Sequence, residues 1–318
     1  MRAIVKNFLL LLLIIPTLSC SKKEEETTPV EDEPETTIEV NCEIINKVST
    51  GVTFDYATEL PFLEEVYANF EDYSREKDRE SFRTILFYND LPLFITGKEV
   101  SGIVSITLDG AGFENYIIDN PNPHELQISA IEFSVYDGAA TSWATYHEVI
   151  SGDTIGSGID LFFYLKTPAG WKLATTNNTY VLPGDENDYG VSDPMLEEPS
   201  VVLNNMLTAF NSKDTTAFLT NFKDESTLYM LSGSITEAFS SDTHTPEAFA
   251  NCAFDTTNPI TLSVIDVAIE VRDHYLATVV TNYAMEQNGV VTQSGELVMT
   301  MIGTPSDGWK ISATTLTF

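Results

Sequence analysis

Hydrophobic residues recur at helical spacing in two separate parts of the chain, and strand-like alternation follows each part. Apolar positions within 62–73, and again within 202–210, lie three or four residues apart, which predicts two amphipathic helices. A second, short helix is predicted over 81–86. Apolar and polar residues alternate over 126–135 and 262–271, which predicts strands with one buried face.

Two more long strands follow in each half of the chain, joined by turns at 151–153 and 287–289. The last strand of each half comes after a Gly-Trp-Lys turn and covers 173–181 or 311–318. Helices that precede a meander of antiparallel strands indicate an α+β domain rather than a parallel sheet. The pattern therefore predicts two α+β domains in tandem.

The two halves are copies of one another. Shifted by 136 residues, the chain is identical to itself at fifteen of 61 ungapped positions over 77–137, where unrelated sequences would share roughly four. Lys77-Asp78 matches Lys213-Asp214. After two single-residue slips, Gly170-Trp171-Lys172 matches Gly308-Trp309-Lys310. The period is too long for a solenoid unit, so we expect each copy to be a domain with its own core.

The repeat and the composition divide the chain into five segments. We expect a lipoprotein signal peptide over 1–19, an acidic disordered tether over 20–41, a first domain over 42–182, a linker over 183–196 and a second domain over 197–318. The tether combines blocks of like charge with Thr-Pro and Glu-Pro steps, which resist helix and sheet.

The N-terminal segment indicates export. An apolar run over 8–15 follows two basic residues, and it is too short to span a bilayer, which predicts a secretory signal. Thr17-Leu18-Ser19-Cys20 resembles the bacterial lipoprotein box, and ordinary cleavage near Ser19 is the alternative. Residues 21–26 resemble the surface-export tag of lipoproteins in the Bacteroidota. We therefore expect lipidation of Cys20 and a surface-exposed protein of the bacterial outer membrane.

The charge and the motifs exclude several function classes. The chain has 48 acidic and 16 basic residues and a net charge of −32, which repels phosphate backbones and argues against nucleic acid as a partner. Membrane attachment would then depend on the lipid. The four histidines lack metal-binding spacing, and no nucleophile elbow or nucleotide-binding loop occurs, so we expect no metal and no cofactor.

The cysteines allow one disulfide in the exported chain. With Cys20 lipidated, Cys42 and Cys252 remain, and an extracytoplasmic setting permits them to pair. Two buried thiols are the alternative. Because Cys252 aligns with Tyr116 in the first copy, such a bridge would not be repeated.

The order of predicted elements resembles the nuclear transport factor 2-like (NTF2-like) superfamily, which includes SnoaL-like and ketosteroid isomerase-like domains. In the second copy the resemblance is carried by residues 209–214 at a helix junction, 277–283 on a strand, and 295–301 with 307–311 at the end. The repeat extends it to the first copy. It implies two tandem cone-like domains, each with N-terminal helices packed on a curved antiparallel sheet around an apolar pocket.

The resemblance also implies where catalytic residues would lie. Isomerases of this superfamily use a tyrosine on the first helix and a carboxylate base on the strand before the glycine. By spacing, the tyrosine position falls at about Phe70 and Met206, and the base falls near Phe94 and Met230. Neither Phe nor Met can accept a proton, which argues against isomerase chemistry in either copy.

The best candidate for a ligand pocket lies on a strand of the first copy. Alternation places Trp143 and His147 on one face of that strand, and we group with them Tyr146 and its repeat partner Tyr283. An exposed strand face or a structural histidine is the alternative for the first two residues. The second copy has apolar residues in place of Trp143 and His147, whereas a tyrosine kept in both copies favours core packing.

Three functions are consistent with these observations. The leading hypothesis is a lipid-anchored surface protein without enzymatic activity, whose tandem domains bind a small apolar ligand or a partner protein. The second is a small-molecule enzyme, isomerase-like or hydrolase-like, that uses Trp143, His147 and either Glu148 or Asp160 of the first domain. The third is a structural protein of the envelope. The two domains could pair with each other, or the protein could form a homodimer.

Overall fold

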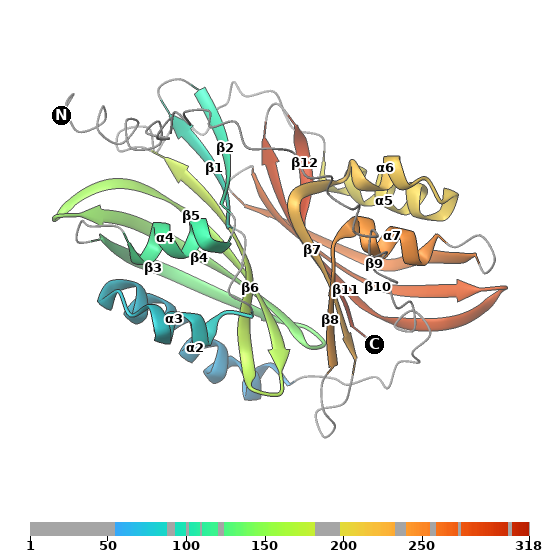
Figure 1. Cartoon of the computed structure of the whole chain (residues 1–318), viewed down its shortest axis with the longest axis horizontal. Coiled ribbons are helices and arrows are strands. Elements are labelled where there is room, and N and C mark those ends of the chain that lie inside the picture. The colour runs from blue at the N-terminus through green and yellow to red at the C-terminus, as the bar shows by residue number, and fades with distance from the viewer. Residues whose placement is uncertain are drawn as a thin grey trace, which may run out of the picture. The chain divides into compact units, whose positions relative to one another are not determined.

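The computed structural model describes ten stretches of the chain. They are 55–87, 93–99, 102–108, 110–119, 124–181, 198–232, 240–254, 259–272, 275–304 and 307–317. The predicted signal peptide, the tether, Cys20, Cys42 and the linker over 183–196 lie outside the described residues. Each domain is an α+β unit in which two helices precede a six-stranded sheet, and a third helix lies between its second and third strands (Figure 1).

The first domain begins with two helices and continues as a sheet in the order β2-β1-β6-β5-β4-β3. The sequence predicted an antiparallel sheet, and all strand pairs but one are antiparallel. The exception is β1 with β6, which are parallel. Its elements are α2 (Tyr56–Glu76), α3 (Arg79–Ile85), β1 (Leu93–Glu99), β2 (Gly102–Leu108), α4 (Gly110–Ile118), β3 (His124–Val135), β4 (Ala139–Ile150), β5 (Asp153–Thr167) and β6 (Gly170–Val181).

The second domain repeats this arrangement, with the sheet order β8-β7-β12-β11-β10-β9 and one parallel pair, β7 with β12. Its first helix is 14 residues long, against 21 in the first domain. The elements are α5 (Pro199–Ser212), α6 (Thr215–Leu219), β7 (Phe222–Ser232), β8 (Ser240–His244), α7 (Pro246–Ala253), β9 (Ile260–Arg272), β10 (Leu276–Gln287), β11 (Val290–Thr304) and β12 (Gly308–Thr317).

The repeated Lys-Asp pair makes the same helix junction in both domains. Lys77 and Lys213 end the first helix in the left-handed conformation, with φ of 60° and 61°. The next residue caps the following helix: Asp78 Oδ1 accepts from the Ser81 amide at 3.1 Å, and the aspartate of the second copy does the same at 2.9 Å. This pair is therefore shared because it sets the angle between the two helices.

The repeated Gly-Trp-Lys turn ties the last strand to the second helix. Gly170 and Gly308 take φ of 103° and 67°, where a side chain would be strained. Lys172 then donates its ammonium group to the carbonyl of Thr84, at the end of α3. The lysine of the second copy makes the equivalent bond to the carbonyl of Thr220, the C-cap of α6. The repeat thus preserves turns and caps that define the fold.

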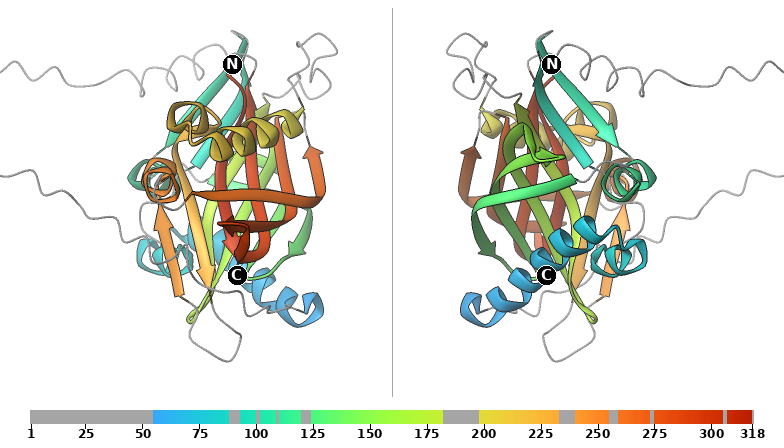
Figure 2. Two further views of the ribbon diagram at one scale, coloured as in Figure 1. Left: turned by 90° about the vertical axis from the view of Figure 1, so that its right-hand side faces the viewer. Right: turned by 90° about the vertical axis from the view of Figure 1, so that its left-hand side faces the viewer.

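Each domain has its own hydrophobic core between its helices and its sheet. Phe70 of α2 packs edge-on against Phe162 of β5, with ring centroids 5.1 Å apart. In the second domain Phe210 of α5 is fully buried and lies against Phe254 at 5.3 Å. The helices of each domain lie on the side of its sheet that faces away from the other domain (Figure 1). Figure 2 views the molecule from these two sides, so that the helices of the nearer domain lie in front of its sheet.

The outer faces of the two sheets pack against each other. One buried cluster joins Phe163 and Ala174 of the first domain to Tyr229 and Val298 of the second. The Tyr229 hydroxyl donates to the Ala174 carbonyl at 2.8 Å, and the Asp137 amide donates to a carboxylate oxygen of the second domain at 2.8 Å. Burial raises the pKa of the Asp137 carboxyl to about 6. The contact is therefore an apolar core with a polar rim.

Two further features concern the ends and the surface of the fold. No helix of the described part of the chain is long and apolar enough to cross a membrane. Cys252 on α7 is disulfide-bonded, and the other two cysteines of the sequence lie outside the described residues.

Candidate functional site

The structure separates the residues that the sequence grouped into one pocket. Trp143 lies on the outer face of β4, 3 % exposed, in the contact between the two sheets. The Arg272 guanidinium of the second domain lies over its ring at 5.0 Å. His147 lies four residues further along β4, on the same face, and is exposed. Trp143 therefore belongs to the domain contact, and His147 lies on the surface.

Tyr146 and Tyr283 point into the interiors of their own domains. The Tyr146 hydroxyl donates to the carbonyl of Thr179 at 2.8 Å, and the Tyr283 hydroxyl donates to that of Thr317 at 3.2 Å. Each tyrosine pairs across the sheet with a glycine of the repeat, Gly158 in the first domain. A Cβ at Gly158 would lie 1.8 Å from the Thr179 carbonyl oxygen. The two tyrosines are thus equivalent packing residues of separate domains.

A buried polar cluster surrounds Tyr146 in the first domain. Asp160 on β5 is 5 % exposed and accepts a hydrogen bond from the Asn178 amide on β6. The Tyr146 hydroxyl lies 3.1 Å from the Asn178 side-chain oxygen. Glu148, two residues beyond Tyr146 and 4 % exposed, accepts from the Tyr116 hydroxyl of α4 at 3.3 Å. Two carboxyls, two phenols and one amide from four elements therefore meet on the inner face of the sheet.

Burial dominates the electrostatics of this cluster. It raises the pKa of the Asp160 carboxyl to about 7, and the neighbouring Glu148 carboxylate adds to the increase while the Asn178 hydrogen bond opposes it. Burial also raises the pKa of the Tyr116 and Tyr146 hydroxyls well above their usual value. Asp160 thus exchanges its proton near neutral pH, and both tyrosines remain hydrogen-bond donors.

The second domain has replaced this cluster with apolar residues. Strand register makes the equivalence direct, because Asp160 pairs with Asn178 across β5 and β6 where Leu297 pairs with Leu316 across β11 and β12. The same repeat offsets place Met285 at the position of Glu148 and Cys252 at that of Tyr116. Leu297, Met285 and Leu316 are buried in the core of the second domain, where the Tyr283 hydroxyl accepts from the buried Gln293 amide at 2.9 Å. Of the interior residues compared here, only the tyrosine is kept in both domains.

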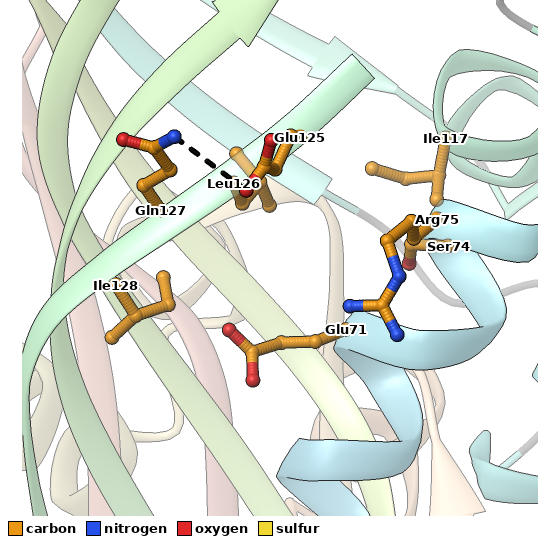
Figure 3. A pocket seen from close by; sticks show the side chains of 8 residues that line it. All are labelled: Glu71, Ser74, Arg75, Ile117, Glu125, Leu126, Gln127 and Ile128. Carbon is orange, nitrogen blue, oxygen red and sulfur yellow. Dashed lines mark hydrogen bonds between the residues drawn. The ribbon is translucent and has the colours of Figure 1, made fainter. Parts of the chain in front are cut away.

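A pocket of about 340 Å³ opens beside this cluster, between α2, α4 and β3 (Figure 3). Leu126 and Ile128 on β3 form its half-buried apolar floor. Their cross-strand partners on β4 are Glu148 and Tyr146, so the floor and the polar cluster are adjacent on the inner face of the sheet. The lining residues are Glu71, Ser74, Arg75, Ile117, Glu125, Leu126, Gln127 and Ile128.

The lysine at the end of the first helix has a different partner in each domain. Lys77 donates to the Ile117 carbonyl of α4 at 2.8 Å. In the second domain the equivalent lysine donates to the Ile260 carbonyl of β9. Asn211 there forms two hydrogen bonds with the backbone of Leu262, at 2.8 and 2.9 Å. These bonds join helix and strand in the second domain.

Two repeat positions explain the difference in space. Asn211, which joins α5 to β9, corresponds to Arg75, whose guanidinium pairs with Asp72 on the same helix. Ser74 corresponds to Phe210, which fills the core of the second domain with no exposed area. A small residue and the loss of the amide contacts therefore leave the pocket in the first domain.

The positions that the family resemblance assigns to catalysis lie apart from this pocket. Phe70 and Met206 face the cores of their domains, as does Met230. Phe94 does not face the interior as expected, because it packs with Trp143 on the outer face of the sheet. Ile95, its neighbour, packs against the core of the first domain, so the inward position is also apolar.

The sequence pointed to part of the site. Tyr146 was predicted as a pocket residue, and Glu148 and Asp160 were named as alternatives under the enzyme hypothesis. Trp143 and His147 were predicted in the same pocket, where the structure does not place them. Asn178, Tyr116 and the pocket residues of α2 were missed. A comparison of polarity between the two copies would have found them, because Asp160, Glu148, Asn178 and Tyr116 all align with apolar residues or cysteine.

Among the described residues, no group of three or more His, Cys, Asp or Glu side chains is arranged to hold a metal ion. The polar cluster supplies two carboxyls, two phenols and one amide. Such a set can accept and donate hydrogen bonds, neutralise a positive charge, and exchange one proton near pH 7.

No protein-family model and no curated protein matches this sequence. Solved structures that resemble it include an NTF2-like protein of unknown function from Shewanella baltica, 20% identical over 40% of this chain and 98% of that chain, with a TM-score of 0.31. A putative dehydratase of the NTF2-like family from Streptomyces avermitilis is 14% identical, over 40% of this chain and 99% of that one, with a TM-score of 0.32. A protein of unknown function with a cystatin-like fold from Nostoc punctiforme is 17% identical, over 42% and 96%, with a TM-score of 0.31.

Proposed function

We propose that this chain is a lipid-anchored surface protein of two NTF2-like domains, in which the first domain binds a small molecule and the second stabilises it. One observation carries the proposal. The two domains share their turns, caps and strand order, and yet the buried polar cluster of the first domain, which adjoins a pocket of about 340 Å³, is replaced in the second by Leu297, Leu316 and Met285. After the duplication, the groups that could bind a ligand are thus found together in the first domain.

The cost of the polar cluster supports a role in binding. Burying carboxyls and phenols in a protein interior is unfavourable compared with burying apolar side chains of similar size. The second domain shows that this fold can fill the same positions with Leu297, Leu316 and Met285. A cluster that the fold does not need is expected to serve a ligand.

A second candidate function, acid–base catalysis, has one observation in its favour. The Asp160 carboxyl has a pKa of about 7 and lies close enough to Glu148 to be affected by its charge. A carboxyl that exchanges its proton near neutral pH can act as a general acid or a general base. Loss of turnover in Asp160→Asn with unchanged ligand affinity would favour this function over simple binding.

The anchoring half of the proposal rests on the sequence around Cys20. Its test is separate from that of binding. Cys20→Ala should move the protein from the membrane fraction to the soluble fraction of expressing cells, and protease added to intact cells should digest the wild-type protein. A variant that stays in the membrane would contradict the lipid anchor.

The binding half can be tested by filling the pocket. Ser74→Phe introduces the residue that the second domain has at this position, and it should abolish the hits that a small-molecule library gives with the wild-type chain in ligand-observed NMR. Ala68→Phe adds the same ring at an exposed position of α2 and should keep them. Hits that survive Ser74→Phe, or a wild-type chain without any, would contradict binding in this pocket.

A further inference from the structure

The pocket of the first domain has an acidic side and an apolar side. Glu71 reaches into it from α2, and Glu125 lies at the start of β3 on the opposite wall (Figure 3). Ile117 of α4 and the floor residues Leu126 and Ile128 supply the apolar surface. A ligand that fits both sides carries a polar, charged end and a small apolar body.

The charges around the pocket favour a cation. Arg75 is the one basic residue of the lining, and its guanidinium already pairs with Asp72. Lys77 lies next to the lining, with its ammonium group on the Ile117 carbonyl. The three carboxylates of Glu71, Asp72 and Glu125 against these two cations leave a net charge of −1 around the pocket. Glu148 lies beside the floor as the cross-strand partner of Leu126. An anionic ligand would be repelled here, as it would by the chain as a whole.

Glu71 is the carboxylate most available to a ligand. Among the described residues it forms no hydrogen bond and no ion pair, although it is half-buried. Glu125, by contrast, accepts a weak hydrogen bond of 3.5 Å from Gln127. Burial and the charge of Asp72 raise the pKa of the Glu71 carboxyl, and Arg75 only partly offsets them. A positive charge placed beside Glu71 would relieve this unfavourable arrangement.

We propose that the pocket binds a small organic ammonium ion, with the ammonium group at Glu71 and its alkyl or aromatic body on Ile117, Leu126 and Ile128. The proposal rests on the function proposed above for the first domain, and it specifies the chemistry of the ligand. A charge-assisted hydrogen bond to the carboxylate supplies specificity, and the apolar floor supplies the burial of the body.

Three probes of nearly equal shape test the charge. Benzylammonium, benzyl alcohol and benzoate differ in the charge of one substituent, and their affinities for the full chain can be measured by titration calorimetry at pH 7. We expect benzylammonium to bind at least about tenfold more tightly than benzyl alcohol, and benzoate to bind weakest. Equal affinity for the alcohol, or a preference for benzoate, would overturn the ammonium proposal.

Matched variants locate the charge that matters. Glu71→Gln keeps the shape of the side chain and should weaken benzylammonium binding about tenfold while leaving benzyl alcohol unaffected. Glu65→Gln makes the same change on an exposed position of α2 and should leave both affinities unchanged. An equal loss in both variants would mean that the charge of the whole helix, and not this site, attracts the cation, and it would overturn the proposal.

The outcomes separate this proposal from the one it depends on. If Ser74→Phe abolishes library hits but benzylammonium shows no preference over the alcohol, the first domain binds small molecules and the ammonium proposal is wrong. If Ser74→Phe changes nothing and none of the three probes binds, both proposals are wrong.

Discussion

Substitutions at single positions determine which of the two domains has polar side chains in its interior. Asp160 and Asn178 in the first domain occupy the positions of Leu297 and Leu316 in the second, on strands with the same register. Ser74 and Arg75 occupy those of a buried phenylalanine and of an asparagine that joins helix to strand. A few substitutions on a common frame thus place a pocket and a buried polar cluster in the first copy, where the second has leucine, methionine and phenylalanine side chains.

The buried carboxyl of Asp160 predicts a specific dependence of stability on pH. Its pKa is about 7 in the folded protein against an ordinary 3.8, so between these values the folded state holds a proton that the unfolded chain has released. Stability should therefore fall as the pH rises from about 4 to 7 and level off above. Besides burial, the groups that affect the pKa of this carboxyl are the Asn178 amide, which lowers it through a hydrogen bond, and the Glu148 carboxylate, which raises it.

Asp160→Asn removes this titration and keeps an oxygen to accept from Asn178. The variant should gain stability relative to the wild type at pH 8 compared with pH 4, by an amount on the order of a few kcal/mol, in denaturant unfolding at both pH values. Asp153→Asn, at the exposed first residue of β5, is the control and should leave the pH dependence unchanged. A pH profile of Asp160→Asn that matches the wild type would contradict the burial argument.

At the scale of elements, the repeat predicted helices, strands and turns because their signals are local. The helix junction at Lys77-Asp78 and the Gly-Trp-Lys turns depend on caps and on φ angles that neighbouring residues determine. The hydrophobic pattern predicted no helix or strand at β2, α4, β8 and α7, because elements of five to nine residues are too short to establish a periodicity. The parallel pair in each sheet was missed because strand pairing depends on contacts between segments that are distant in the sequence.

The candidate site was harder to predict because alternation gives the faces of a strand but not what covers each face. Trp143 and His147 do share a face, as predicted, but that face meets the second domain and the solvent. Tyr146, Glu148 and Asp160 lie on the inner face, which the sequence alone could not distinguish from the outer one. The pocket itself depends on where α2 ends relative to β3, a tertiary feature.

The helix junction predicts a modest and local effect of its cap. Asp78→Ala removes the side chain that accepts from the Ser81 amide and should lower the free energy of unfolding by about 1 kcal/mol. Asp72→Ala, which removes an exposed carboxylate from the body of α2, is the comparison and should cost less. Chemical denaturation at neutral pH measures both, and a larger loss for Asp72→Ala would contradict the assignment of the cap.

At the scale of the whole molecule, the contact between the sheets makes the two domains one folding unit. Val298 on β11 is fully buried in the cluster that joins them. Val298→Glu would bury an unpaired carboxylate there, so we expect the single unfolding transition of the wild type in calorimetry to shift down and split into two. Val291→Glu, on the same strand but 53 % exposed, should leave one transition. A single unshifted transition in Val298→Glu would contradict the role of this contact.

The central claim is that the duplicated fold carries one binding site, in its first domain. A crystal structure of the full chain grown with benzylammonium tests it most directly. We expect density for the probe between Glu71 and the floor of Leu126 and Ile128, and none in the core of the second domain. Density inside the second domain, or a first-domain pocket that remains empty at a saturating probe concentration, would contradict it.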